Sequence, residues 1–169
     1  MTFKVFISSS LEDIHLVNEL KETLERYGIL PILPMEMAEL KQYIEGARPY
    51  RPSKEDLTPM IMQQIQTSDC VLVIVGRGGK RSEFVDFETG VATAQNKLII
   101  PIVEEGAEIP KTLANKEYIL IDRNQPRLSY ERAAQYLNKL KIEKERRNAI
   151  GGLLLLGLGF LLLAALVSD

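Results

Sequence analysis

Five short apolar runs recur between residues 4 and 121, separated by stretches with helical periodicity. Within each run the hydrophobicity is continuous rather than alternating, which is typical of strands buried on both faces of a parallel sheet. The predicted strands are Lys4–Ile7, Ile29–Leu33, Val71–Val75, Leu98–Val103 and Tyr118–Ile121. Proline interrupts the second and fourth runs, so we expect these two strands to lie at an edge of the sheet or to be bulged.

Amphipathic patterns between the runs predict helices, because apolar residues recur at three-to-four spacing. The predicted helices cover residues 11–27, 59–67 and 83–96, with a last helix that begins near Ser129. Ser10 is expected to cap the first helix and Gly28 to end it. Regular alternation of strands and helices predicts an α/β fold, a flavodoxin-like doubly wound sheet of five parallel strands. Residues 35–57 form an unusually long connection, which we expect to be functional or mobile.

The C-terminal segment is the most apolar part of the chain. Residues 149–167 contain no charged residue, and a helix of this length would be about 28 Å long, close to the hydrocarbon thickness of a bilayer. We therefore expect a single transmembrane helix that anchors the chain by its tail. Residues 141–148 form a basic juxtamembrane linker, which places the domain over residues 1–140 in the cytoplasm. The N-terminal sequence MTFKVFISSS lacks the layout of a signal peptide.

Composition narrows the chemistry further. One Cys and one His argue against a disulfide framework and against a Cys/His metal centre. A formal net charge of -2 argues against a nucleic-acid binder. Cys70 lies at the start of an apolar run and is expected to be a small core residue rather than a nucleophile.

Ligands of open α/β sheets bind beyond the carboxyl ends of the strands, so the residues at these ends are candidate binding residues. They are Ser8 and Ser9 after the first strand, Leu33 and Pro34 after the second, and Arg77 and Arg81 in the glycine-rich stretch after the third. That stretch has neither the GxxxxGK[ST] nor the GxGxxG spacing, so it is either a solvated turn or a phosphate contact.

Glu88 is the sharpest single candidate. It lies in the helix predicted over residues 83–96, beside an apolar stripe that includes Phe84 and Phe87. A carboxylate next to the sheet-facing side of a helix is desolvated unless it is paired or used in chemistry. Glu88 is therefore a candidate catalytic group. Its position alone also permits a structural carboxylate that pairs with Arg77 or Arg81 or that points to solvent.

Several of these stretches resemble the TIR (Toll/interleukin receptor) domain family, particularly its microbial branch. They are VFISSS at residues 5–10, YGI at 27–29, SDCVLVIV at 68–75, S-x-F-V-x-x-E-x-G-x-A at 82–92 and KLIIPI at 97–102. The resemblance covers about residues 3–140, and the block around Glu88 is its specific part. Phe84 replaces the usual Trp of the family motif, and residues 35–57 are longer than the family's loop that governs assembly and access to the site.

The resemblance implies cleavage of the nicotinamide–ribose bond of NAD+, with Glu88 as the catalytic residue. It gives nicotinamide and either ADP-ribose or a cyclic ADP-ribose. By family position, Phe84 would wall the nicotinamide side, whereas Ser8, Ser9, Leu33 and Pro34 would line the pocket. Arg77 or Arg81 would meet the pyrophosphate. NAD+ is then a substrate, and no cofactor or metal is expected. The family further implies activation by self-association or by other TIR domains, in a defence or stress-signalling setting.

Two alternatives remain open from the sequence. The chain could be a non-enzymatic TIR module that signals by TIR–TIR binding, because a carboxylate alone does not make an enzyme. Nucleoside 2-deoxyribosyltransferases share the fold and an E-x-G-x-A motif in which the Glu is the nucleophile. Their motif carries a Gly-Thr pair ahead of the Glu, which this sequence lacks although Asp86 is present.

Overall fold

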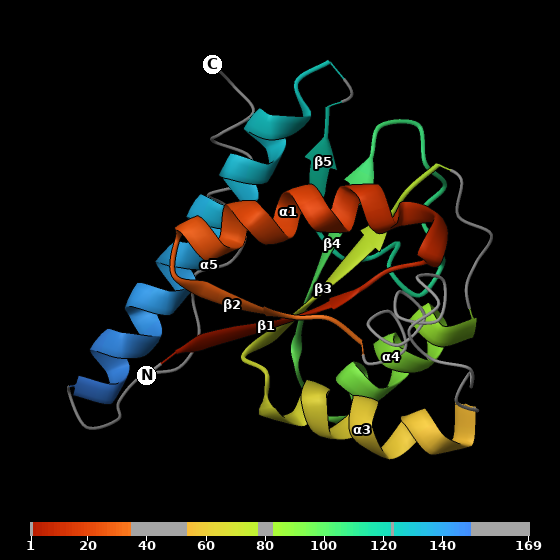
Figure 1. Cartoon of the computed structure of the whole chain (residues 1–169), viewed down its shortest axis with the longest axis horizontal. Coiled ribbons are helices and arrows are strands. Elements are labelled where there is room, and N and C mark those ends of the chain that lie inside the picture. Colours follow the sequence, from red (N-terminus) through yellow and green to blue (C-terminus); the bar gives the residue numbers. More distant parts are fainter. Residues whose placement is uncertain (1, 35–53, 78–82, 123, 150–169) are drawn as a thin grey trace, which may run out of the picture.

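The computed structural model describes residues 2–34, 54–77, 83–122 and 124–149, which form a sheet between two layers of helices (Figure 1). Five parallel strands follow the order β2-β1-β3-β4-β5. They are β1 (Phe3–Ser8), β2 (Ile29–Ile32), β3 (Cys70–Val75), β4 (Leu98–Glu104) and β5 (Ile119–Ile121). This is the strand order of flavodoxin-like sheets, so the predicted α/β class with a five-stranded parallel sheet is confirmed.

The two strands that contain proline behave differently. β2 is an edge strand, as expected from Pro31. The same expectation is wrong for β4, which lies between β3 and β5. Pro101 pairs with Val73 of β3, but pairing with β5 begins only at Ile102. Pro101 therefore lies where β4 has a strand on one side only, and there a missing backbone N–H is tolerated.

The helices cover the two faces of the sheet in pairs (Figure 1). One pair consists of α1 (Ile14–Arg26) and α5 (Pro126–Ala149), and the other of α3 (Lys54–Thr67) and α4 (Glu83–Ala94). A short 3₁₀ helix, η1 (Leu11–Asp13), directly precedes α1. The alternation of side chains along β1 divides the core, since Val5 and Ile7 pack toward α1 and α5 whereas Phe6 packs toward α3 and α4. Each face of the sheet thus has its own hydrophobic cluster.

The first and second predicted helices differ from expectation at their starts. Ser10 precedes η1 rather than an α-helix, and its hydroxyl donates to Asp13 Oδ2 at 2.6 Å. Gly28 ends the helix region as predicted, with φ +64°. α3 begins at residue 54, so the last residues of the predicted 35–57 loop are helical, because Leu57 is buried on the same face as Ile61. Residues 35–53 of that loop lie outside the described residues.

α5 continues through residues 141–148, which the sequence suggested as a separate linker. Lys144 forms an ion pair with Asp69, and Lys141 Nζ donates to the carbonyls of Tyr27 and Gly28 at 3.2 Å each. These contacts hold the basic stretch on the domain. Within the described ranges, no helix is long and apolar enough to cross a membrane. The predicted transmembrane segment 149–167 lies outside the described residues except for Ala149.

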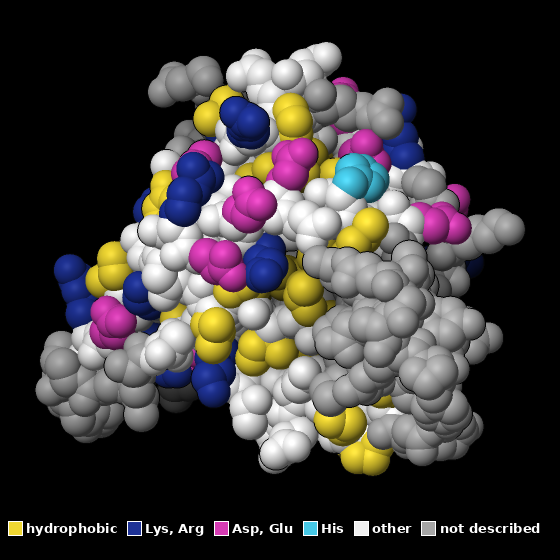
Figure 2. Space-filling model, viewed as in Figure 1, with side chains coloured by type: hydrophobic (Ala, Val, Ile, Leu, Met, Phe, Trp, Pro, Cys, Tyr) yellow, Lys and Arg dark blue, Asp and Glu magenta, His cyan; other side chains and the backbone are white. Residues whose placement is uncertain are grey.

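α1 and α5 are also joined at the surface, where acidic and basic side chains are intermixed (Figure 2). Arg26 and Tyr27 both contact Glu131, the guanidinium at 2.7 Å and the phenol at 2.9 Å. These partly exposed contacts supplement the apolar packing beneath them, and the exposed ion pair stabilises the fold by less than about 1 kcal/mol.

Cys70 is a core residue, as predicted. It is 1% exposed at the start of β3. Burial raises the pKa of its thiol, the neighbouring Asp69 carboxylate raises it further, and Lys97 opposes the shift. The thiol is therefore protonated at neutral pH and is a poor nucleophile.

Candidate active site

A buried polar pair lies where the carboxyl end of β1 meets α4. Ser8 is the last residue of β1 and follows Phe6 by two positions, so its side chain faces α4. Glu88 lies in the middle of α4 and is 1% exposed. The Ser8 hydroxyl donates a hydrogen bond to Glu88 Oε2. The structure therefore brings together two of the residues predicted for the site, from positions 80 residues apart in the chain.

The connection after β1 is tied to the connection after β3 by a second buried carboxylate. Asp13 is 3% exposed, and its Oδ2 accepts both the Ser10 hydroxyl and, at 3.3 Å, the backbone N–H of Gly76. A Cβ at Gly76 would lie 1.8 Å from Asp13 Oδ1, so only glycine permits this approach. Asp13 and Gly76 are 63 residues apart, so their contact has no local signal in the sequence.

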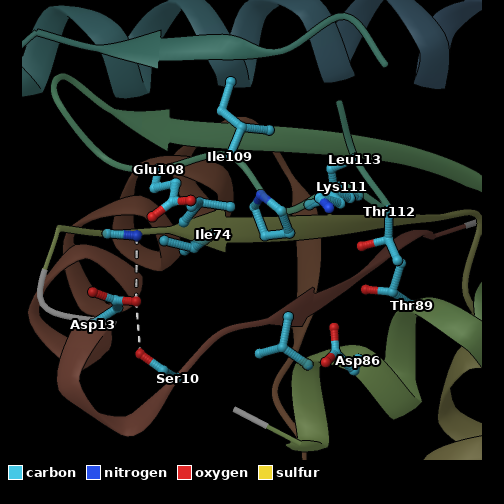
Figure 3. Close-up of a pocket in the computed structure, with 14 residues that line it drawn as sticks. Ser10, Asp13, Ile74, Asp86, Thr89, Glu108, Ile109, Lys111, Thr112 and Leu113 are labelled. Atoms are coloured by element: carbon cyan, nitrogen blue, oxygen red, sulfur yellow. Dashed lines mark hydrogen bonds between the residues drawn. The ribbon is translucent and has the colours of Figure 1, made fainter. Parts of the chain in front are cut away.

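A cavity of about 370 Å³ opens beside this contact, between η1, the start of α4 and residues 108–113 (Figure 3). α4 contributes Val85, Asp86 and Thr89 to its wall. Glu88 is absent from this wall and contacts Ser8 instead. The cavity and the Ser8–Glu88 pair are thus neighbouring features that share one helix. Residues 108–113 were missed by the sequence analysis, because that irregular segment matches no motif.

The remaining predicted site residues are dispersed. Ser9 and Pro34 are buried near the strand ends, whereas Leu33 packs against the hydrophobic cluster beneath α1 and α5, on the face opposite α4. Phe84 lies in the first turn of α4, but its side chain is outside the described part of the structure, as is Arg81.

Arg77 contacts the connection after β4. Its backbone N–H donates to Glu104 Oε2 at 2.9 Å, and its Nε donates to the Glu105 carbonyl at 2.6 Å. Its guanidinium also lies against Gly106, where a Cβ would be 2.6 Å from a guanidinium nitrogen. These contacts of Arg77 therefore lie with the connection after β4.

Residues 5–140 match the TIR domain family, and the chain belongs to this family. Among solved structures, it is similar to the TIR domain of the Toll-related receptor TRR-2 from Hydra magnipapillata, with a TM-score of 0.58 and 21% identity, over 82% of this chain and 99% of the other. A prokaryotic SEFIR domain is similar at a TM-score of 0.52 and 22% identity, over 79% and 97%.

A third similar structure is an enzyme. It is the 2-deoxyribosyltransferase of Bacillus psychrosaccharolyticus, with a TM-score of 0.54 and 16% identity, over 73% of this chain and 90% of the other. At these identities the likeness extends to the fold alone. No curated protein matches the chain at a significant level.

Proposed function

We propose that this TIR domain cleaves the nicotinamide–ribose bond of NAD+ and that Glu88 is its catalytic residue. The observation that carries the proposal is the burial of the Glu88 carboxylate at the carboxyl end of the sheet, where the Ser8 hydroxyl donates to it. A buried carboxylate acts far more strongly on a developing positive charge than one in water, because the local dielectric constant is low. Membership of the TIR family supports the choice of substrate.

The chemistry needs one anionic group near the ribose. When the C1′–N bond breaks, both electrons move to the ring nitrogen, which gives neutral nicotinamide and an oxocarbenium-like ribose. Glu88 stabilises that positive charge, as carboxylates do in glycoside hydrolysis. The Ser8 hydroxyl holds the carboxylate in one orientation. Water then adds to C1′ and loses a proton, giving ADP-ribose; attack by an adenine nitrogen in place of water gives the cyclic product.

Self-association is proposed as the trigger. Glu88 is 1% exposed, so NAD+ reaches the carboxylate only after the groups around it move. Residues 149–167 anchor the chain in a membrane with residues 1–140 in the cytoplasm, in this proposal. Two-dimensional clustering then raises the effective concentration of neighbouring domains without requiring a new contact. We propose a role in defence or stress signalling because the TIR family implies it.

The test uses the full chain reconstituted in lipid vesicles at low and at high surface density. We expect NAD+ loss with equimolar release of nicotinamide, rising more than proportionally with density. Glu88→Gln should lower turnover by about 10²- to 10³-fold or more, because it removes the charge that stabilises the transition state. Glu117→Gln, on an exposed loop, is the matched control and should retain turnover.

Absence of turnover in the folded wild-type protein at high density would overturn the proposal. In that event a non-enzymatic TIR module is the second candidate, because a carboxylate that is 1% exposed can also serve only to hold the fold together. Binding of the chain to itself or to another TIR domain, unaffected by Glu88→Gln, would then support that candidate. Turnover of 2′-deoxynucleosides instead of NAD+ would favour a transferase of the kind that shares the fold.

A further inference from the structure

The cavity beside α4 is separate from the Ser8–Glu88 pair. Its volume of about 370 Å³ is within the range of small-molecule sites, which extends from about 300 to 1,000 Å³. Three connections meet around it, after β1, β3 and β4, at the carboxyl edge of the sheet (Figure 3). Its wall combines aliphatic groups with convergent polar side chains, which is the usual composition of such a site.

The aliphatic part of the wall provides a surface for a flat apolar ring. It consists of Ile74, Val75, Val85, Ile109, Pro110 and Leu113. Leu113 is 1% exposed and belongs to the hydrophobic cluster beneath α3 and α4, so this part of the wall is anchored in the core. A base placed there would displace water from apolar surface, which favours binding.

The polar part of the wall is rich in acceptors. Asp86 and Glu108 contribute carboxylates, and the hydroxyl groups of Thr89 and Thr112 lie toward one another on the α4 side (Figure 3). Each carboxylate has about four lone-pair sites, so it can accept a pair of hydroxyl groups in addition to any partner it has. A cis-diol is the group that carboxylates accept when they hold the ribose of a nucleotide in other doubly wound folds.

The charge of the wall excludes phosphate. Asp13, Asp86 and Glu108 line the cavity, and Lys111 is the one cation among the described lining residues. An anionic group within about 4–6 Å of these carboxylates would be repelled. No group of three or more His, Cys, Asp and Glu side chains in the described part of the chain is arranged to hold a metal ion.

We propose that this cavity binds an unphosphorylated ribonucleoside, with the base on the aliphatic wall and the ribose diol on Asp86. The site does not depend on NAD+ cleavage. Its occupant would contact the same helix that carries Glu88, since Asp86 and Thr89 also lie on α4. A nucleoside held there would be well placed to stabilise the start of α4.

Binding is measured by equilibrium dialysis of the full chain in detergent micelles, in a Glu88→Gln background so that turnover does not disturb the equilibrium. The probes are the four common ribonucleosides, 2′-deoxyadenosine and adenosine monophosphate. We expect at least one ribonucleoside to bind with one-to-one stoichiometry, and adenosine to bind about tenfold more tightly than either its deoxy or its phosphorylated form, the size of effect expected for one charged hydrogen bond.

Two variants assign the discrimination to particular side chains. Asp86→Asn should abolish the preference for the 2′-hydroxyl, and Glu108→Gln should bring the affinity for adenosine monophosphate closer to that for adenosine. Glu117→Gln, outside the cavity, should change neither preference. Circular dichroism of each variant establishes that it is folded, and Thr112→Val, which removes one hydroxyl from the wall, serves as a replacement if Asp86→Asn does not fold.

The proposal is overturned if the folded protein binds none of the ribonucleosides, if the monophosphate binds as tightly as adenosine, or if a folded Asp86→Asn protein retains the full 2′-hydroxyl preference. If Asp86→Asn does not fold, full retention of that preference by Thr112→Val overturns it. NAD+ turnover is measured separately on the wild-type protein. Binding without turnover contradicts only the proposed enzyme, and turnover without binding contradicts only this site.

Discussion

Charged side chains have different roles at the two ends of the parallel strands, which are called here the amino-terminal and the carboxyl-terminal edge of the sheet. At the amino-terminal edge, charges join one element to another and stay partly exposed. Lys97 Nζ donates to the carbonyls of Gln66 and Ser68, both at 2.7 Å, which links the start of β4 to the end of α3. Asp69 accepts the backbone N–H of Lys4 at 2.8 Å and pairs with Lys144 of α5.

At the carboxyl-terminal edge, two carboxylates are buried. Glu88 is held by Ser8, and Asp13 is held by Ser10 and the N–H of Gly76. Burial takes both carboxylates out of water, and the desolvation of a carboxylate costs free energy. Features that cost stability and converge beside a cavity are typical of functional sites. The comparison therefore predicts that removing a charge at the carboxyl-terminal edge changes activity, whereas removing a charge at the amino-terminal edge changes stability.

The largest expected effect is a dissociation of activity from stability at Glu88. Glu88→Gln should lower NAD+ turnover by about 10²- to 10³-fold or more, while the free energy of unfolding changes by less than about 1 kcal/mol, since the variant removes a desolvated charge but keeps an acceptor for Ser8. Urea unfolding followed by circular dichroism, beside the turnover assay, measures both. A loss of several kcal/mol would show that the carboxylate is structural.

The next effect tests the close contact at the carboxyl edge. Gly76→Ala should destabilise the fold by about 2–4 kcal/mol, because the new methyl group overlaps the Asp13 carboxylate and forces the two connections apart. Gly90→Ala is the matched control. Outside the backbone of its own helix, no atom of the described residues lies within 4 Å of the place that a Cβ would take there, and alanine in the middle of α4 should stabilise by about 0.5–1 kcal/mol. Equal changes in the free energy of unfolding of the two variants would contradict a close contact between Gly76 and Asp13.

At the amino edge, Asp69→Ala should destabilise by about 1–2 kcal/mol, because it removes a partly exposed ion pair and leaves the Lys4 N–H without its acceptor. Turnover per folded molecule should not change. Glu145→Ala, on the exposed side of α5, provides the comparison in thermal unfolding. A lower turnover of Asp69→Ala, measured when all molecules are folded, would show that the amino-terminal edge also affects activity and would contradict the comparison.

The smallest effect concerns Cys70. Its pKa is raised in the folded protein, so above about pH 9 the unfolded chain loses the thiol proton while the folded chain keeps it. Stability from this group is therefore complete below that pH and falls as pH rises, by at most about 1.4 kcal/mol per pH unit. Between pH 9 and 10 Cys70→Ala should lose less stability than wild type. Burial raises the pKa of Tyr130 to about 12, so that phenol adds a similar decline only at higher pH.

The predicted sheet was accurate because strands and helices leave local signals. All five strands lie within one or two residues of their predicted bounds. A short, continuous apolar run such as Val71–Val75 is a local signal of a buried strand. The errors lie where distant neighbours decide. β4 is an inner strand despite Pro101, because β5 begins pairing one residue later. α3 is longer than predicted because Leu57 gains burial against the sheet.

The sequence by itself determined the α/β class, the chain order of the elements and the place of Glu88 on a helix beside an apolar stripe, because periodicity depends on residues only a few positions apart. Only the tertiary structure decided which groups meet. Ser8 and Glu88 are 80 residues apart, and Asp13 and Gly76 are 63 apart. Their contacts depend on the order of strands in the sheet, which brings separate connections to one edge. That order is set by the packing of the whole domain, so no local pattern encodes it.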